Sequence, residues 1–118
     1  QTVVPPVRGD SIQLKQVVLN LLMNGIEAAS RAPARDRRVT ATVSVRGREV
    51  QVAIRDTGPG LPTDDPEELF APFVSRRADG LGMGLAISRG IAEAHDGRLW
   101  GENDPDGGAV FRLRLPTP

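Results

Sequence analysis

Residues 11–31 read SIQLKQVVLNLLMNGIEAASR, and the pattern of this stretch decides the fold. Its apolar residues recur three or four positions apart, which is the spacing of one face of an α-helix. They are Ile12, Leu14, Val17, Val18, Leu21, Leu22 and Ile26. Asp10, with Gln13 three positions later, is typical of a helix N-terminus, and Pro33 ends the pattern. The sequence therefore predicts one long amphipathic helix over residues 11–31.

The rest of the chain supplies strands and a second helix. Alternating apolar residues predict two antiparallel strands over 39–45 and 50–54, joined by a turn at 46–49. Residues 98–102 and 109–115 predict a second hairpin, and residues 66–70 a short helix. A further helix is expected over 84–95, where the buried positions would be Leu85, Ile87, Ile91 and Ala92. These elements predict the α+β class, as a two-layer α/β sandwich in which a mixed, mostly antiparallel sheet packs on helices.

The composition excludes several classes of protein. The chain has 118 residues, which suits a single domain over residues 1–118. Fifteen basic residues balance fifteen acidic ones, so no overall charge favours nucleic acid or a membrane surface. There is no cysteine, hence no disulfide and no thiolate metal site. No apolar run approaches the roughly 20 residues of a membrane span, and a chain beginning at Gln1 is typical of an excised piece.

A polar stripe follows the long helix beside its apolar face. Its members lie three or four positions apart and are Gln13, Gln16, Asn20, Asn24 and Glu27. A solvated helix face would explain the stripe, but asparagine is a poor helix former, and two of them one turn apart need a reason. Amide oxygens are suitable ligands for a Mg²⁺ ion that also binds phosphates. Gly25 would let another group approach the helix closely.

A second constellation is Asp56-Thr57-Gly58-Pro59-Gly60. Asp56 has the parity of Val52 and Ile54 in its strand, so its carboxylate is expected to face the core. A buried carboxylate needs hydrogen-bond donors, and the amino group of adenine would be one, with Thr57 assisting. A plain turn in which Asp56 caps local amides is an equally good explanation at this point.

The third constellation is the glycine-rich stretch over residues 75–84, SRRADGLGMG, which leads directly into the predicted second helix. Gly80, Gly82 and Gly84 would let backbone N–H groups converge on an anion at the helix N-terminus, with Arg76 and Arg77 nearby. The pattern is neither a P-loop nor a dinucleotide-binding turn. A flexible surface loop would also explain it.

Taken in this order, the three constellations resemble the catalytic and ATP-binding domain of two-component sensor histidine kinases. This family shares a superfamily with gyrase, MutL and the large heat-shock chaperone. Residues 16–28 resemble its N box and residues 56–60 its first glycine box. Residues 69–73 (LFAPF) resemble its F box, and residues 80–87 (GLGMGLAI) its second glycine box. The resemblance runs from about Arg8 to Pro116 and is nearest to the oxygen-sensing and nitrogen-regulating kinases. It implies the Bergerat ATP-binding fold.

The resemblance also implies roles for individual residues. Asn24 would bind Mg²⁺, with Asn20 supporting the metal or the phosphates, and Arg77 would lie near the γ-phosphate. Asn20, Asn24 and Arg77 are the implied catalytic residues. The implied pocket for ATP consists of Asn24, Asp56, Thr57, Gly58, Gly60, Phe73, Arg76, Arg77, Gly80, Gly82, Met83, Gly84 and Leu85. Glu27 stands where many relatives carry a basic residue.

The implied activity is transfer of the γ-phosphoryl group of Mg²⁺·ATP to a histidine on a separate dimerisation domain, which is absent from this chain. His95 does not match the acceptor motif, and capping or packing accounts for it. A response regulator would be an indirect partner, and we expect a cytoplasmic domain, monomeric when isolated, whose parent protein could be membrane-anchored. An ATP-hydrolysing or ATP-switched module, a serine kinase of a regulatory protein and a degenerate partner-binding domain are the alternatives. Asn20 argues against hydrolysis, because an amide cannot act as a general base.

Overall fold

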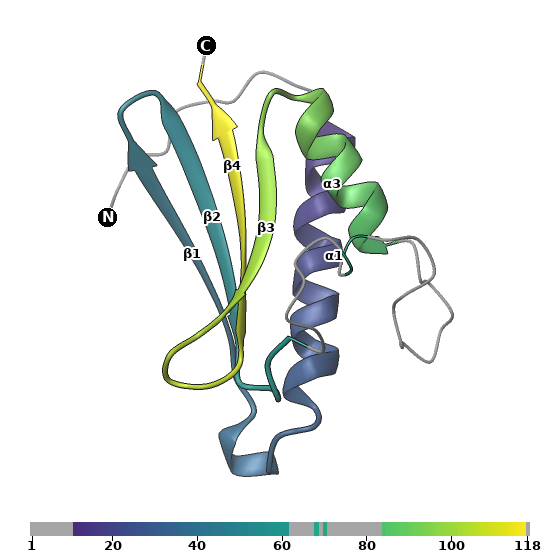
Figure 1. Ribbon diagram of the computed structural model, residues 1–118, viewed down its shortest axis with the longest axis vertical. Helices are drawn as coiled ribbons and strands as arrows, with labels where there is room; N and C mark the ends of the chain where they lie inside the picture. The colour runs from purple at the N-terminus through teal and green to yellow at the C-terminus, as the bar shows by residue number, and fades with distance from the viewer. Residues whose placement is uncertain (1–10, 62–67, 69, 71–83, 118) are drawn as a thin grey trace.

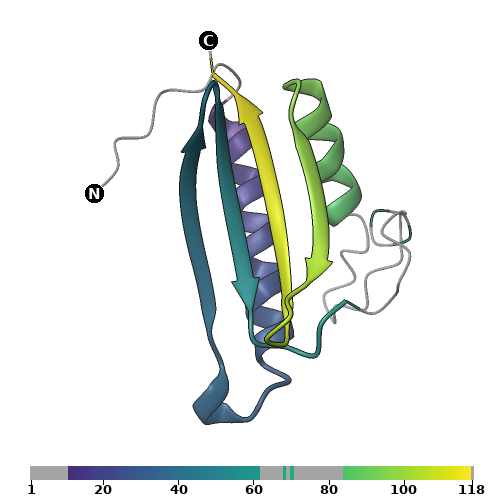
Figure 2. The same ribbon diagram turned by 60° about the vertical axis from the view of Figure 1, so that its left-hand side comes forward.

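The computed structural model describes residues 11–61, 68, 70 and 84–117, which form two layers. One layer is a sheet of four strands, and helices α1 (Ser11–Ala29) and α3 (Gly84–Ala94) pack on one face of it (Figure 1). Turning the molecule by 60° shows both helices on the same side of the strands (Figure 2). The predicted sandwich of sheet and helices is therefore confirmed.

Helix α1 provides the largest helical contribution to the core. Val17 and Leu21 are fully buried, and Leu14, Val18 and Leu22 pack partly buried against the same cluster. The apolar repeat is wider than the buried strip, because Ile12 is 77% exposed and Ile26 is also exposed. At about 100° per residue, these two lie roughly 180° and 140° around the helix from Leu21.

The strands form one sheet in the order β1-β2-β4-β3. Their bounds are β1 (Val39–Arg46), β2 (Glu49–Asp56), β3 (Arg98–Asn103) and β4 (Ala109–Pro116). A short 3₁₀ turn, η1 (Ala34–Asp36), precedes β1. Every pair among the described strands is antiparallel, in agreement with the mostly antiparallel sheet that the sequence predicted. β4 enters between β2 and β3, so the end of β2 lies beside the start of β4.

Helix α3 corrects one sequence prediction. Ile87 was expected to be buried but is 44% exposed, whereas Ser88 is fully buried together with Ala92. Leu85 and Ile91 pack partly buried against the core, as predicted. The buried side of α3 follows positions 85, 88 and 92, and Ile87 lies outside that strip. A buried serine hydroxyl thus stands at the interface where an apolar residue was expected.

The remaining core residues come from the sheet and from Phe70, and the buried cluster consists of Val17, Leu21, Ile54, Phe70, Ala92, Leu99, Phe111, Leu113 and Leu115. Of the short helix predicted over 66–70, the structure describes only Glu68 and Phe70. His95 ends the second helical region with its Nδ1 atom 2.8 Å from the carbonyl oxygen of Ile91, in agreement with a structural role. None of the described helices is long and apolar enough to span a bilayer.

Candidate functional site

The centre of the site is Asp56, the last residue of β2. It is 2% exposed, and its side chain lies on the core face of the strand, as its parity with Ile54 predicted. Its Oδ1 atom accepts a hydrogen bond from the backbone N–H of Gly58 (2.8 Å) and another from that of Ala109 (3.4 Å). Burial raises the pKa of the Asp56 carboxyl, and the two backbone bonds oppose that rise with a smaller effect.

The second carboxylate oxygen of Asp56 is not used by the described part of the protein. No described residue forms a hydrogen bond to Oδ2. Among those residues, no side-chain nitrogen or oxygen is both sealed from solvent and without a partner. Oδ2 therefore keeps an open side from which it can accept an N–H group of a ligand. A carboxylate oxygen is an acceptor, so it suits a ligand that presents an amino group.

Two glycines allow close approaches of the backbone around Asp56. A Cβ atom on Gly58 would lie 2.5 Å from the carbonyl oxygen of Ala28, one turn after Asn24 in α1. A Cβ atom on Gly108 would collide with the backbone oxygen of Asp56, and Gly108 also has a φ of +80°. Only glycine permits both approaches. Gly58 thereby places the segment after β2 against the helix that carries the polar stripe.

The loop between β3 and β4 completes this end of the site. The Oδ1 atom of Asn103 accepts a hydrogen bond from the backbone N–H of Leu61 at 2.7 Å. Gly60 has a φ of +93°, and its lack of a side chain leaves room for the side-chain amide of Asn103. On the other face of β2, Arg55 forms an ion pair with Asp104 at 2.6 Å. These contacts hold the loop beside Asp56. Gly108, Ala109 and Asn103 were not predicted to belong to the site. The one signal in the sequence that could have indicated this close approach is the glycine pair Gly107-Gly108.

Thr57 is occupied by the protein itself. Its hydroxyl accepts the backbone N–H of Arg38 (2.8 Å) and lies 3.3 Å from the carbonyl oxygen of Arg38. This clamp joins the end of β2 to the residue before β1. It gives Thr57 a structural role, and its contact with a nucleotide base stays a prediction.

The polar stripe of α1 divides into residues with different environments. The Nδ2 atom of half-buried Asn20 donates to the Oγ atom of Ser88 in α3 at 3.1 Å. Within the described part of the chain, the amide of half-buried Asn24 has no hydrogen-bond partner. Glu27 forms an ion pair with Arg31 at 3.1 Å. The two asparagines are thus the members of the stripe that combine burial with an available amide oxygen.

Gly25 packs toward the sheet. A Cβ atom there would lie 3.3 Å from a methyl group of Val39 and 3.6 Å from one of Ile54. The close approach that the sequence predicted at Gly25 is therefore made by the sheet.

The asparagines fit a magnesium ion that arrives with a nucleotide. Within residues 11–61, 68, 70 and 84–117, no three His, Cys, Asp or Glu side chains come together to hold a metal. Amide oxygens are neutral, and Mg²⁺ commonly completes its shell with phosphates and waters. Asn24 and Asn20 would hold the ion, which when bound would neutralise charge on the phosphates.

The glycine-rich part of the predicted pocket lies mostly outside the described residues. This holds for Phe73, Arg76, Arg77, Gly80, Gly82 and Met83. Gly84 is the first residue of α3, and Leu85 follows it, packed against the core. Of the predicted pocket, the structure places Gly58, next to Asp56, against Ala28, which lies one turn after Asn24 in α1.

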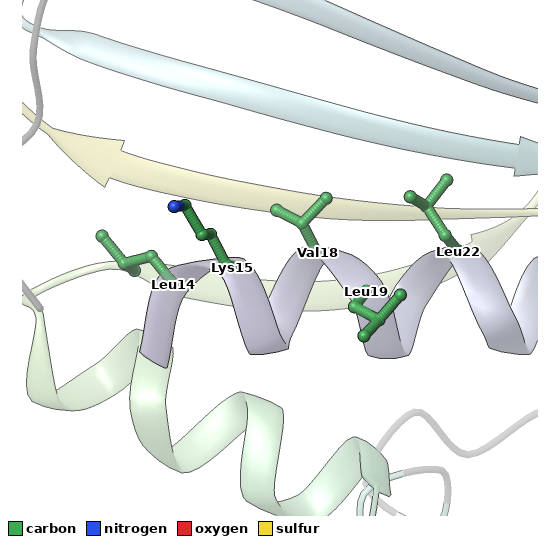
Figure 3. Close-up of a pocket in the computed structure, with 5 residues that line it drawn as sticks. All are labelled: Leu14, Lys15, Val18, Leu19 and Leu22. Carbon is green, nitrogen blue, oxygen red and sulfur yellow. The ribbon is translucent and has the colours of Figure 1, made fainter. Parts of the chain in front are cut away.

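A hollow of about 380 Å³ lies along α1, away from Asp56 and Asn24. Figure 3 shows its lining residues, Leu14, Lys15, Val18, Leu19 and Leu22. Val18 and Leu22 project toward the strands, in agreement with their packing against the core. The hollow has no part in the polar site.

The raised pKa of Asp56 predicts a pH-dependent stability. An acid whose pKa is higher in the folded state stabilises the fold below the unfolded value, near 3.8, and this contribution is lost as the pH rises through the folded value. Asp56→Asn removes the titration. We measure chemical denaturation without nucleotide. The free energy of unfolding of the variant minus that of the wild type is expected to increase between about pH 3 and about pH 7. A difference that stays constant or shrinks over this range would contradict the burial effect.

Gly58 is expected to tolerate no side chain. Gly58→Ala should lower the free energy of unfolding by about 1–3 kcal/mol, because the added methyl group overlaps the backbone of Ala28. Gly90→Ala, at an exposed α3 position with nothing within 4 Å, is the matched control and should raise it by about 1 kcal/mol. Thermal and urea unfolding of both variants measure this. Equal effects of the two changes would show that Gly58 does not pack on α1 in this way.

Comparison with known families identifies the class of protein to which this site belongs. The family model described as histidine kinase-, DNA gyrase B-, and HSP90-like ATPase matches residues 9–118. The chain belongs to this family, and the resemblance inferred from the sequence boxes is confirmed.

Within the family, the chain is a catalytic domain of the sensor histidine kinase type. It is 41% identical over 115 residues to the sensor histidine kinase TmoS of Ectopseudomonas mendocina. It is also 41% identical over 111 residues to the sensor protein FixL of Bradyrhizobium diazoefficiens. These alignments cover 96% and 94% of this chain, which spans only 12% of the length of TmoS and 22% of that of FixL.

Solved structures give the same answer for the fold. The nucleotide-free catalytic domain of the histidine kinase ThkA is 34% identical, with a TM-score of 0.80 over 94% of this chain and 70% of that one. Full-length ShkA in complex with AMPPNP is 30% identical, with a TM-score of 0.78 over 96% of this chain and 23% of that one. The two-layer sandwich is thus the fold of histidine kinase catalytic domains.

Proposed function

We propose that this domain binds Mg²⁺·ATP and donates the γ-phosphoryl group to a histidine on a dimerisation domain outside this chain. The observation that carries the proposal is Asp56, a buried carboxylate with one oxygen fixed by two backbone N–H groups and the other open. Burying a charge in this way is costly, and a ligand that supplies the missing donor explains why it is kept. The AMPPNP complex of ShkA supports a nucleotide as that ligand.

The asparagines favour transfer over hydrolysis. Asn24 would bind Mg²⁺ with Asn20 beside it, and neither amide can take a proton from water. The remaining task of the protein is to hold the γ-phosphate in line with an acceptor nitrogen, which is the main source of catalysis in phosphoryl transfer. A two-component pathway would follow from this chemistry. ThkA, one of the structural neighbours, has been solved in complex with the response regulator protein TrrA. We accordingly infer an indirect response-regulator partner and a cytoplasmic site of action, where ATP is supplied.

A chimaera tests the proposed transfer. In it, this chain replaces the matching segment of FixL, and the protein is incubated with Mg²⁺ and ATP labelled in the γ-phosphate. The expected product is protein-bound phosphate that is lost in acid and kept in base, as a phosphohistidine is. The same chimaera with Asp56→Asn should remain unlabelled. Rapid release of free phosphate without labelled protein would favour an ATPase, and an acid-stable phosphoserine would favour a serine kinase.

A further inference from the structure

Ser88 is a buried polar residue of α3 at the interface with α1. It is 0% exposed and stands in α3 between the buried or half-buried positions of Leu85 and Ala92. A hydroxyl taken out of water costs free energy unless it finds a partner. Its partner is the side-chain amide of Asn20 in α1, whose Nδ2 atom donates to Oγ at 3.1 Å. The hydroxyl therefore has a specific task at this interface.

The bond determines how the amide of Asn20 is turned. An asparagine side chain has one acceptor oxygen and one donor nitrogen, and only the oxygen can bind a cation. Because Nδ2 is directed to Ser88, Oδ1 is directed away from it. Asn24 has no hydrogen-bond partner of this kind within the described residues. Of the two asparagines, Asn20 is therefore the one whose amide is oriented before a ligand binds.

We propose that Ser88 is a positioning residue that holds the Oδ1 atom of Asn20 toward the bound Mg²⁺·phosphate group. This inference rests on the proposed function, because it assigns Asn20 to that group. It also links the two helices functionally, since Ser88 lies one turn after Gly84, the first residue of α3. Partners that orient a metal ligand typically contribute about 10- to 100-fold to metal affinity or activity.

The test is the gain in affinity that Mg²⁺ gives to a non-hydrolysable ATP analogue, measured by calorimetry on this chain. Ser88→Ala removes the hydroxyl and should reduce the gain by about 10-fold. The affinity for ADP without Mg²⁺ should change by less than about 2-fold, because that affinity depends on the Asp56 end of the site. Ser88→Cys, close to serine in size but a weak hydrogen-bonding group, should act like Ser88→Ala. Ser88→Thr, which keeps the hydroxyl, should retain the gain.

A double-mutant cycle separates positioning from packing. If Ser88 acts through Asn20, Ser88→Ala should have no further effect on the Mg²⁺ gain in an Asn20→Ala background. Additive losses, or equal losses of affinity for ADP and for the Mg²⁺-bound analogue, would overturn the inference and leave Ser88 a packing residue. A normal gain in a folded Ser88→Ala or Ser88→Cys variant would also overturn it. Absence of any gain in the wild type would instead contradict the proposed function.

Discussion

Asp56→Asn is expected to lower the affinity for ADP by at least about 100-fold while the fold stays intact. In the proposed site, the open Oδ2 atom of the wild-type carboxylate accepts a hydrogen bond from the adenine amine. The Oδ1 atom of the introduced asparagine can still accept the N–H group of Gly58. In that orientation, the NH₂ group of the asparagine faces the ligand. Two donors would face each other, and the loss is that of a charged hydrogen bond plus an unpaired amine.

Calorimetric titration with ADP measures the effect, and denaturation of the same samples checks the fold. Asp36→Asn, in the exposed turn η1, is the matched control and should leave the affinity for ADP unchanged. Because burial disfavours the charged form of Asp56, we further expect Asp56→Asn to be at least as stable as the wild type at neutral pH. Unchanged affinity in a folded Asp56→Asn variant would mean that the base does not bind at this carboxylate.

Asn24→Ala is expected to lower the affinity for the Mg²⁺-bound ATP analogue by about 10- to 100-fold. The amide of Asn24 is half-buried and has no partner among the described residues, so its oxygen is available to the ion. The affinity for ADP without Mg²⁺ should stay within about 2-fold, because Asp56 and its glycines are unchanged. The contrast between the two titrations is the diagnostic result.

Gln16→Ala is the control for Asn24→Ala. Gln16 belongs to the same stripe but lies two turns earlier and is exposed. Its replacement should leave both affinities unchanged. If both variants lowered the affinity for the Mg²⁺-bound analogue equally, the stripe would act through its general polarity and not through coordination of the ion by Asn24.

Much of the fold could be predicted because it rests on local periodicity. The 3.6-residue repeat of α1 and the alternation of Val50, Val52 and Ile54 each report one buried face. The order of the strands could not be read in this way, because β4 enters between β2 and β3 through pairing distant in sequence. The prediction that Ile87 is buried was wrong for a related reason. A short helix offers several apolar strips, and packing against α1 selected the one that contains Ser88.

The site was predictable as far as single residues carry their own signal. The parity of Asp56 placed its carboxylate on the core face, and the structure confirms that burial. The contacts of Gly108, Ala109 and Asn103 were not predictable, since they come from a hairpin about fifty residues further along the chain. Thr57 shows the opposite case, where a residue of a recognisable motif has a hydroxyl already bound to backbone. For Arg77 and Phe73, the assignments stay predictions.

The most direct test of the account is calorimetric titration of this chain with ADP and with a non-hydrolysable ATP analogue, each with and without Mg²⁺. We expect ADP to bind without the ion and Mg²⁺ to strengthen binding of the analogue. No binding of either nucleotide under any of the four conditions would contradict the central claim that the open carboxylate of Asp56 and the asparagines of α1 form an ATP site.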